Sequence, residues 1–152
     1  MKSISSSKLI GRKIQEVYCQ SFYYRKNISC DAIAIFLKLN DNYWYKLISG
    51  DGVSKILMSE EQVPFYVNEE PQLKDEFEYP IKKPKSNFIL NLGEIVKIEE
   101  YLWKGYMDES FGFLITFDDD KQASFIESDD CLSIIEGRIN DLESKYTLVE
   151  LK

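Results

Sequence analysis

Hydrophobic and polar residues alternate most regularly in two segments, residues 33–39 and 111–117. Every second position is apolar: Ile33, Ile35, Leu37 and Leu39 in the first segment, and Phe111, Phe113, Ile115 and Phe117 in the second. Successive side chains of a strand point to opposite faces of a sheet, so this period of two predicts two β-strands. Polar triplets follow at residues 40–42 and 118–120. Asn and Asp favour tight turns, so we expect hairpins leading to further strands at residues 43–49 and 121–127.

The two segments belong to a longer similarity between the halves of the chain. Residues 35–56 align with residues 113–134 without a gap at a shift of 78 positions, and residues 9–14 resemble residues 91–96 at a shift of 82. We therefore predict an internal repeat, residues 9–58 and 91–136, that arose by duplication. Each half is expected to be a four-stranded meander. Its first strand lies at residues 14–24 or 95–104, and its fourth at residues 53–58 or 131–136.

Two segments outside these strands are less regular. The connector, residues 68–86, is polar and contains three prolines, with one helical turn expected near residues 73–77. Residues 131–145 carry apolar side chains at a spacing of three to four, which predicts a short helix and competes with the fourth strand there. Gly137 weakens both alternatives. The tail, residues 146–151, is predicted to be a final strand.

These elements predict a mainly β fold. The chain has 152 residues, which suits a single domain spanning residues 1–152. Two similar four-stranded antiparallel meanders can cover each other's apolar faces as one barrel or as a sandwich. A β-rich α+β fold stays open through the short C-terminal helix.

Histidine and cysteine usage narrows the chemistry. The absence of histidine excludes Ser-His-Asp and Cys-His hydrolases and histidine-ligated metal sites. The three cysteines are an odd number without Cys-x-x-Cys spacing, which argues against a disulfide framework and favours Cys19 and Cys131 as inert core thiols. We therefore expect a reduced, cytoplasmic protein. No signal peptide and no run of roughly 20 apolar residues is apparent.

Charge is distributed unevenly along the chain. The net charge is −7, with +5 in residues 1–26 and −9 in residues 86–152. An acidic surface repels nucleic acid and anionic lipid and attracts basic proteins. We therefore expect a protein partner with a basic surface, and neither nucleic acid nor membrane as a partner.

Two acidic clusters are the candidate partner-binding residues: Asp118, Asp119 and Asp120 in one, and Glu127, Asp129 and Asp130 in the other. The clusters are expected at opposite ends of one strand, roughly 25 Å apart, so they cannot form a single metal site. The Asp-x-Asp-x-Asp-Gly loop of an EF-hand is absent. No metal, cofactor or catalytic residue is predicted, and a solvated turn is the alternative interpretation of each cluster.

Aromatic residues form a second candidate feature, an exposed patch or a cavity that includes Tyr43, Trp44, Tyr45 and Trp103. If the sheet closes, Tyr43 and Tyr45 would line the interior of a small-ligand or lipid-binding β-barrel together with Phe111, Phe113 and Phe117. A homodimer formed through exposed strand edges or aromatic side chains is compatible with either function.

In its small size, acidity, β-rich pattern and lack of catalytic residues, the chain resembles the immunity proteins that bacteria keep against their own polymorphic or contact-dependent toxins. The resemblance is one of overall type and assigns no residue. It implies a non-enzymatic protein that binds a toxin, because an acidic surface can occupy the basic cleft of a nuclease. The leading hypothesis is therefore a protein-interaction domain, and the alternative is the ligand-binding barrel.

Overall fold

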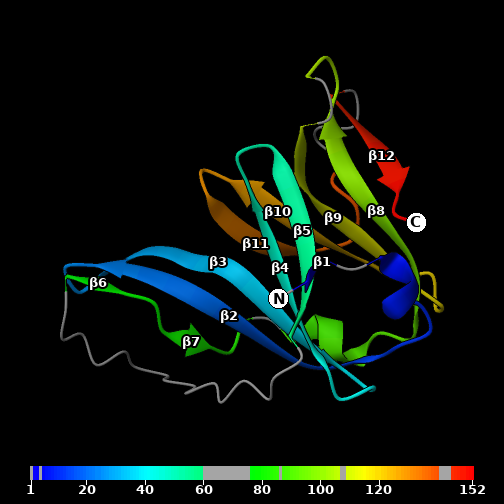
Figure 1. Cartoon of the computed structure of the whole chain (residues 1–152), viewed down its shortest axis with the longest axis horizontal. Coiled ribbons are helices and arrows are strands. Elements are labelled where there is room, and N and C mark those ends of the chain that lie inside the picture. Colours follow the sequence, from blue (N-terminus) through cyan, green and yellow to red (C-terminus); the bar gives the residue numbers. More distant parts are fainter. Residues whose placement is uncertain (1, 4, 60–75, 86, 107–108, 141–144) are drawn as a thin grey trace.

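The computed structural model describes residues 2–3, 5–59, 76–85, 87–106, 109–140 and 145–152. The described strands form two antiparallel sheets (Figure 1). Sheet A has the order β1 (Lys2–Ser3), β5 (Val53–Ser59), β4 (Trp44–Gly50), β3 (Asn27–Leu39), β2 (Ile14–Tyr24), β6 (Phe77–Glu78), and β7 (Ile81–Lys82) also pairs with β2. Sheet B has the order β11 (Cys131–Glu136), β10 (Gln122–Ser128), β9 (Ser110–Phe117), β8 (Ile95–Trp103), β12 (Tyr146–Glu150).

The mainly β prediction is confirmed, and the arrangement is a sandwich. The two sheets remain separate and do not close, so the barrel alternative is wrong. Short 3-10 helices, η1 (Ser6–Lys8) and η2 (Phe88–Asn91), precede β2 and β8. No helix in the described part of the chain is long and apolar enough to cross a membrane.

Strand pairing within sheet A is equivalent to strand pairing within sheet B. Strands β4 and β10 begin and end 78 residues apart, as the sequence alignment predicts. Ile14 opposes Leu39 in the first half as Ile95 opposes Phe117 in the second, and a bulge follows each pair. Equivalent positions at the start of β2 and β8 are therefore 81 residues apart, one fewer than the upstream alignment suggests. Duplication as the origin of this similarity stays a prediction.

The hairpin turns are also equivalent. Asn42 and Asp120 have positive φ angles, 67° and 63°, which Asn and Asp tolerate better than most residues. In each turn an aspartate side chain two residues back accepts a main-chain hydrogen bond, from Tyr43 to Asp41 and from Lys121 to Asp119. The polar triplets thus fix the turns by the chemistry that the sequence predicts.

The main core lies between the sheets. Of the two alternating sets, Ile35, Leu37 and Leu39 and their counterparts Phe113, Ile115 and Phe117 are buried there. The first member of each set, Ile33 and Phe111, lies outside that core. The expected alternation fails there because the register of the β2–β3 ladder shifts between Cys30 and Ala34, and that of the β8–β9 ladder between Ser110 and Gly112.

Phe111 instead joins a second apolar cluster, with Tyr101, Leu114, Ile126 and Tyr146. Residues 137–139 run against this cluster, because the Ser124 hydroxyl donates to the Gly137 carbonyl and the Tyr146 hydroxyl to the Ile139 carbonyl. The prediction of a helix over residues 131–145 is wrong. Residues 131–136 are a strand paired along β10, residues 137–140 are not helical, and residues 141–144 lie outside the described residues.

Strands β2 and β3 continue beyond the rest of sheet A as an arm, residues 20–34 (Figure 1). Among the described strands, β4 pairs with β3 only from Ile35 to Lys38, so the arm is held by the β2–β3 ladder and by β6 and β7. Most of the predicted connector lies outside the described residues. A helical turn is expected from the sequence at residues 73–77. Residues 73–75 of it lie outside the described residues, and Phe77 belongs to strand β6.

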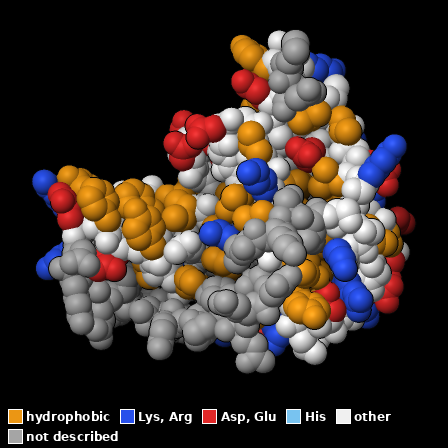
Figure 2. All heavy atoms as spheres, viewed as in Figure 1, with side chains coloured by type: hydrophobic (Ala, Val, Ile, Leu, Met, Phe, Trp, Pro, Cys, Tyr) orange, Lys and Arg blue, Asp and Glu red, His pale blue; other side chains and the backbone are white. Residues whose placement is uncertain are grey.

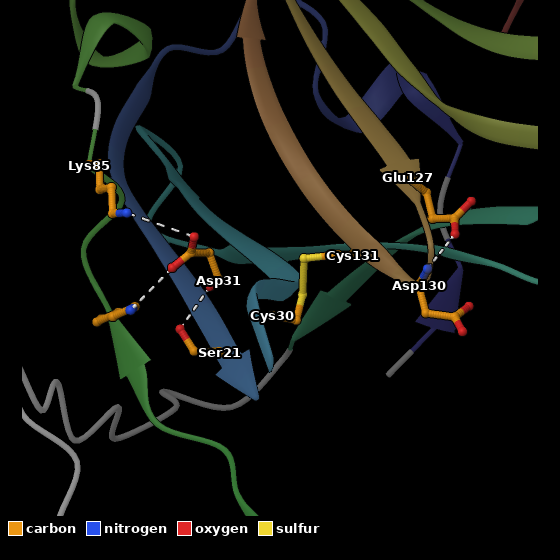
Figure 3. Close-up of a disulfide and its surroundings, with 8 residues drawn as sticks. Ser21, Cys30, Asp31, Lys85, Glu127, Asp130 and Cys131 are labelled. Carbon is orange, nitrogen blue, oxygen red and sulfur yellow. Dashed lines mark hydrogen bonds and ion pairs between the residues drawn. A yellow bond between two sulfur atoms is a disulfide. The ribbon is translucent and has the colours of Figure 1, made fainter. Parts of the chain in front are cut away.

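A disulfide joins the halves of the chain. Cys30 at the arm and Cys131 at the start of β11 are bonded, with Cα atoms 5.7 Å apart and a sequence separation of 101 (Figure 3). The expectation of three free thiols is therefore wrong, and Cys131 is not an inert core thiol. The odd cysteine count misled the prediction because one thiol, Cys19, stays free and buried beside one intact pair.

Candidate functional site

The two predicted acidic clusters lie at opposite ends of β10, which places them on separate surfaces. In the β9–β10 turn, Asp118 accepts a hydrogen bond from the Glu94 amide at 3.0 Å. Asp119 accepts one from the Lys121 amide and lies 3.9 Å from the Lys121 ammonium. Asp119 therefore stabilises its own turn, whereas Asp118 ties this turn to the segment before β8.

The second cluster lies in the β10–β11 turn. The Glu127 carboxylate accepts a hydrogen bond from the Asp130 amide at 2.8 Å (Figure 3). Asp129 and Asp130 both have positive φ angles, 53° and 62°, and both side chains are exposed. The turn thus presents two carboxylates to solvent, and Figure 2 shows acidic side chains at the tip of this hairpin.

The equivalent turn of the first half lies beside it. A Cβ atom at Gly50, next to the exposed Asp51, would be 3.9 Å from an Asp130 carboxylate oxygen. A Cβ atom at Gly52 would be 3.1 Å from the Glu109 side chain, and the Ser110 amide donates to the Gly52 carbonyl at 2.8 Å. The fold therefore brings the β4–β5 and β10–β11 turns together.

We call this surface the acidic end and define it by five carboxylates: Asp51, Glu109, Glu127, Asp129 and Asp130. Among the described residues, none of the five has an ion-pair partner. The sequence prediction missed Asp51 and Glu109. The alignment does pair position 51 with position 129 as equivalent turns, but only the packing of the sheets makes these turns neighbours.

The four predicted aromatic residues do not form one patch. Tyr45 is buried in the main core, where its hydroxyl donates to Asp41 at 2.7 Å, whereas Tyr43 is exposed. Trp44 lies on the other face of the same strand, 5.6 Å from the ring of Tyr18. Trp103 stacks on Phe111 in sheet B at 4.1 Å. The five residues expected to line a barrel are likewise separated, since Phe111 and Tyr43 lie outside the core that holds Phe113, Phe117 and Tyr45.

Exposed aromatic side chains gather instead along the arm. Phe22 and Tyr24 of β2 contact Phe77 at ring distances of 6.1 and 5.3 Å, and Phe22 also stacks on Tyr79 at 5.3 Å. Phe77 and Tyr79 are about half exposed, 50% and 51%. Figure 2 shows hydrophobic side chains along this part of the molecule. The sequence did not suggest this cluster, because Phe77 and Tyr79 belong to the predicted connector.

The described residues offer no metal site and no unpaired buried polar group. No group of three or more Cys, Asp and Glu side chains there is placed to hold a metal ion. No buried side-chain nitrogen or oxygen there lacks a hydrogen-bond partner. Burial and the hydrogen bond to Asp41 raise the pKa of the Tyr45 phenol above its ordinary value. Burial raises the pKa of the Cys19 thiol to about 11.

The raised pKa of Cys19 predicts a loss of stability at alkaline pH. The ordinary thiol pKa is 9.0, so the folded chain holds this proton more tightly than the unfolded chain does. The resulting stabilisation is complete below about pH 9 and is lost as the pH rises to about 11, a change of roughly 2–3 kcal/mol. Urea unfolding at pH 8 to 11 should show a shallower decline for Cys19→Ala than for the natural chain. Parallel declines would contradict the prediction.

No protein-family model, curated protein or solved structure matches this chain. The surface features of the chain itself are therefore the basis on which a function can be inferred.

Proposed function

We propose that this protein is a non-enzymatic interaction domain that binds a basic surface of a partner protein through the acidic end. The observation that supports this function is the convergence of five carboxylates from both halves of the chain, without ion-pair partners among the described residues. Such a surface attracts a basic protein and increases its rate of association. A bacterial toxin with a basic cleft is a partner of this chemistry.

The acidic end is a better candidate for partner binding than the Asp118–Asp120 turn, because fewer of its carboxylates are engaged in hydrogen bonds and ion pairs within the chain. Asp118 and Asp119 both accept main-chain hydrogen bonds, from Glu94 and Lys121 respectively, and Asp119 also lies near the Lys121 ammonium. At the acidic end, only Glu127 accepts a hydrogen bond of this kind among the described residues. More of the negative charge at the acidic end is thus available to a partner.

The disulfide bears on the cellular compartment. The cytoplasmic prediction rests in part on reduced thiols, and the Cys30–Cys131 bond removes that part of its basis. Structural disulfides persist mainly in oxidising compartments. A cytoplasmic location therefore stays a prediction that the cysteines no longer support.

Neutralising the acidic end is expected to weaken partner binding about 10- to 100-fold. The variant is D51N/D129N/D130N, because asparagine keeps the tolerance for positive φ that all three positions require. The partner is first recovered from native lysate at low salt and purified, and Kd is then measured at several salt concentrations. The variant should also show a weaker dependence of Kd on salt, since three charges are gone.

A matched control removes the same charge from the other end of β10. D118N/D119N/D120N also converts three aspartates to asparagine in a turn with one positive φ angle, at Asp120. Its Kd should stay within about twofold of the natural value, since less than 0.5 kcal/mol is expected for a surface change away from the interface. Recovery of no stoichiometric partner would contradict the proposal. So would a larger loss of affinity in the control variant than in D51N/D129N/D130N.

A further inference from the structure

A cavity of about 280 Å³ lies where the arm, the described end of the connector and sheet B meet. Cys19 and Ala32 line it from β2 and β3, residues 82–85 from the connector, and Leu132 and Ile134 from β11. The Cys30–Cys131 bond ties β3 to β11 next to these residues (Figure 3). Two of the elements that bound the cavity, β3 and β11, are therefore covalently linked.

Positive charge is in excess around this cavity. Lys82, Lys83 and Lys85 line it, and Asp31 is the only acidic residue among the described residues that line it. The Asp31 carboxylate lies 3.5 Å from the Lys82 ammonium and 3.9 Å from that of Lys85 (Figure 3). Lys83 is exposed and has no ion-pair partner among the described residues. Three ammonium groups thus share one carboxylate at the cavity, in a chain of net charge −7, and that of Lys83 has no ion-pair partner among the described residues.

The remaining wall is largely apolar. Ala32 and Leu132 are buried core residues, and Ile134 packs against the same core. Pro84 contributes a further apolar surface between Lys83 and Lys85. Ligand sites typically combine an apolar lining with a few convergent polar groups, and this volume is near the lower end of their usual range.

We propose that this cavity binds a small organic anion, a monocarboxylate with a short aliphatic or aryl body. The body contacts the wall formed by Ala32, Leu132 and Ile134, and the carboxylate lies near the Lys83 ammonium. Lysine suits this role because its compact charge on a flexible stem imposes no fixed geometry on the anion. This function is independent of the acidic end, whose residues do not line the cavity.

Titration with octanoate tests the proposal, with binding measured by calorimetry on the full, oxidised chain. Two further probes separate the contributions: 1-octanol has the same chain without the charge, and inorganic phosphate has charge without the chain. We expect octanoate to bind at least about fivefold more tightly than either probe, because only octanoate engages both features. Equal binding of octanol or phosphate, or no binding of octanoate, would overturn the proposal.

Lys83 is the position to vary, because it has no ion pair to lose. Lys82, by contrast, also lies 5.7 Å from the ring of Tyr23, so its removal would disturb the arm. Lys83→Glu should raise the Kd of octanoate about tenfold or more. Lys55→Glu, at an exposed lysine of β5 that does not line the cavity, serves as the matched control and should leave the Kd unchanged. Equal effects of the two changes would assign the binding to net charge and not to this cavity.

Cys19 supplies a second measurement, because it is the free thiol of the chain and lines the cavity. Saturating octanoate should slow alkylation of Cys19 by iodoacetamide, a neutral reagent, at least about threefold in the natural chain. The rate is followed by mass spectrometry. Lys83→Glu at the same octanoate concentration should show little protection. An alkylation rate that octanoate leaves unchanged in the natural chain would place the bound anion elsewhere and overturn the proposal.

Discussion

Replacing both members of the disulfide, as C30A/C131A, is expected to destabilise the fold by about 4–5 kcal/mol and to lower the Tm by about 10–15 °C. The bond closes a loop of 101 residues, so its loss gives the unfolded chain much more conformational freedom. It also removes the covalent link between β3 of sheet A and β11 of sheet B. Thermal unfolding followed by circular dichroism measures the change.

Reduction provides the control for this prediction. Dithiothreitol should lower the Tm of the natural chain to near that of C30A/C131A, and it should leave the variant itself unchanged. This comparison separates the loss of the bond from any effect of the alanine side chains. A natural chain whose Tm is insensitive to complete reduction would show that the bond contributes little to stability.

Gly112→Ala is expected to have the second large effect, a loss of about 3–5 kcal/mol. Gly112 has a φ angle of 153° and lies in β9 between β8 and β10. A Cβ atom there would collide with the carbonyl oxygen of Phe125 and would lie 3.1 Å from the Cα of Ile126. These are main-chain atoms of the neighbouring strand, so they cannot move aside by a side-chain rotation. The ladder between β9 and β10 would have to separate, and urea unfolding would report the loss of stability.

Gly105→Ala is the matched control. Gly105 also has a positive φ angle, 82°, but no atom of the described residues lies within 4 Å of the position where its Cβ atom would be. This change should therefore cost only about 1 kcal/mol, the strain of a left-handed residue. Similar losses for both variants would show that backbone strain, and not the collision with β10, determines the cost at Gly112.

The strands and turns could be predicted from the sequence because their causes are local. The alternation from Ile35 to Leu39 predicts a strand with one face in the core, and this prediction does not depend on which element packs against that face. The turns after β3 and β9 follow from Asn and Asp side chains that bond to their own main chain, as Asp41 and Asp119 do. The offset of 78 residues between equivalent hairpins of the two halves could be predicted for the same reason, since similar local patterns form similar hairpins.

Residues 131–145 show where local pattern is insufficient. Their apolar spacing suits a helix, yet residues 131–136 are a strand. The edge of β10 offers a ladder from Ala123 to Ser128, and pairing with it satisfies main-chain groups of residues 131–136 and buries Leu132. Tertiary context outweighs propensity in such a short segment.

By itself, the sequence determined the strand pattern, the turn chemistry, the similarity of the two halves and the excess of negative charge. Only the tertiary structure decided which distant residues meet: Cys30 with Cys131, Gly50 with Asp130, and the lysines of the connector with β11. It also decided the face to which Phe111 turns, through a register shift in the β8–β9 ladder. The physical reason is the distance along the sequence over which each interaction acts. Alternation and turn formation act between neighbours in the chain, whereas these contacts depend on how two sheets pack, which no local pattern encodes.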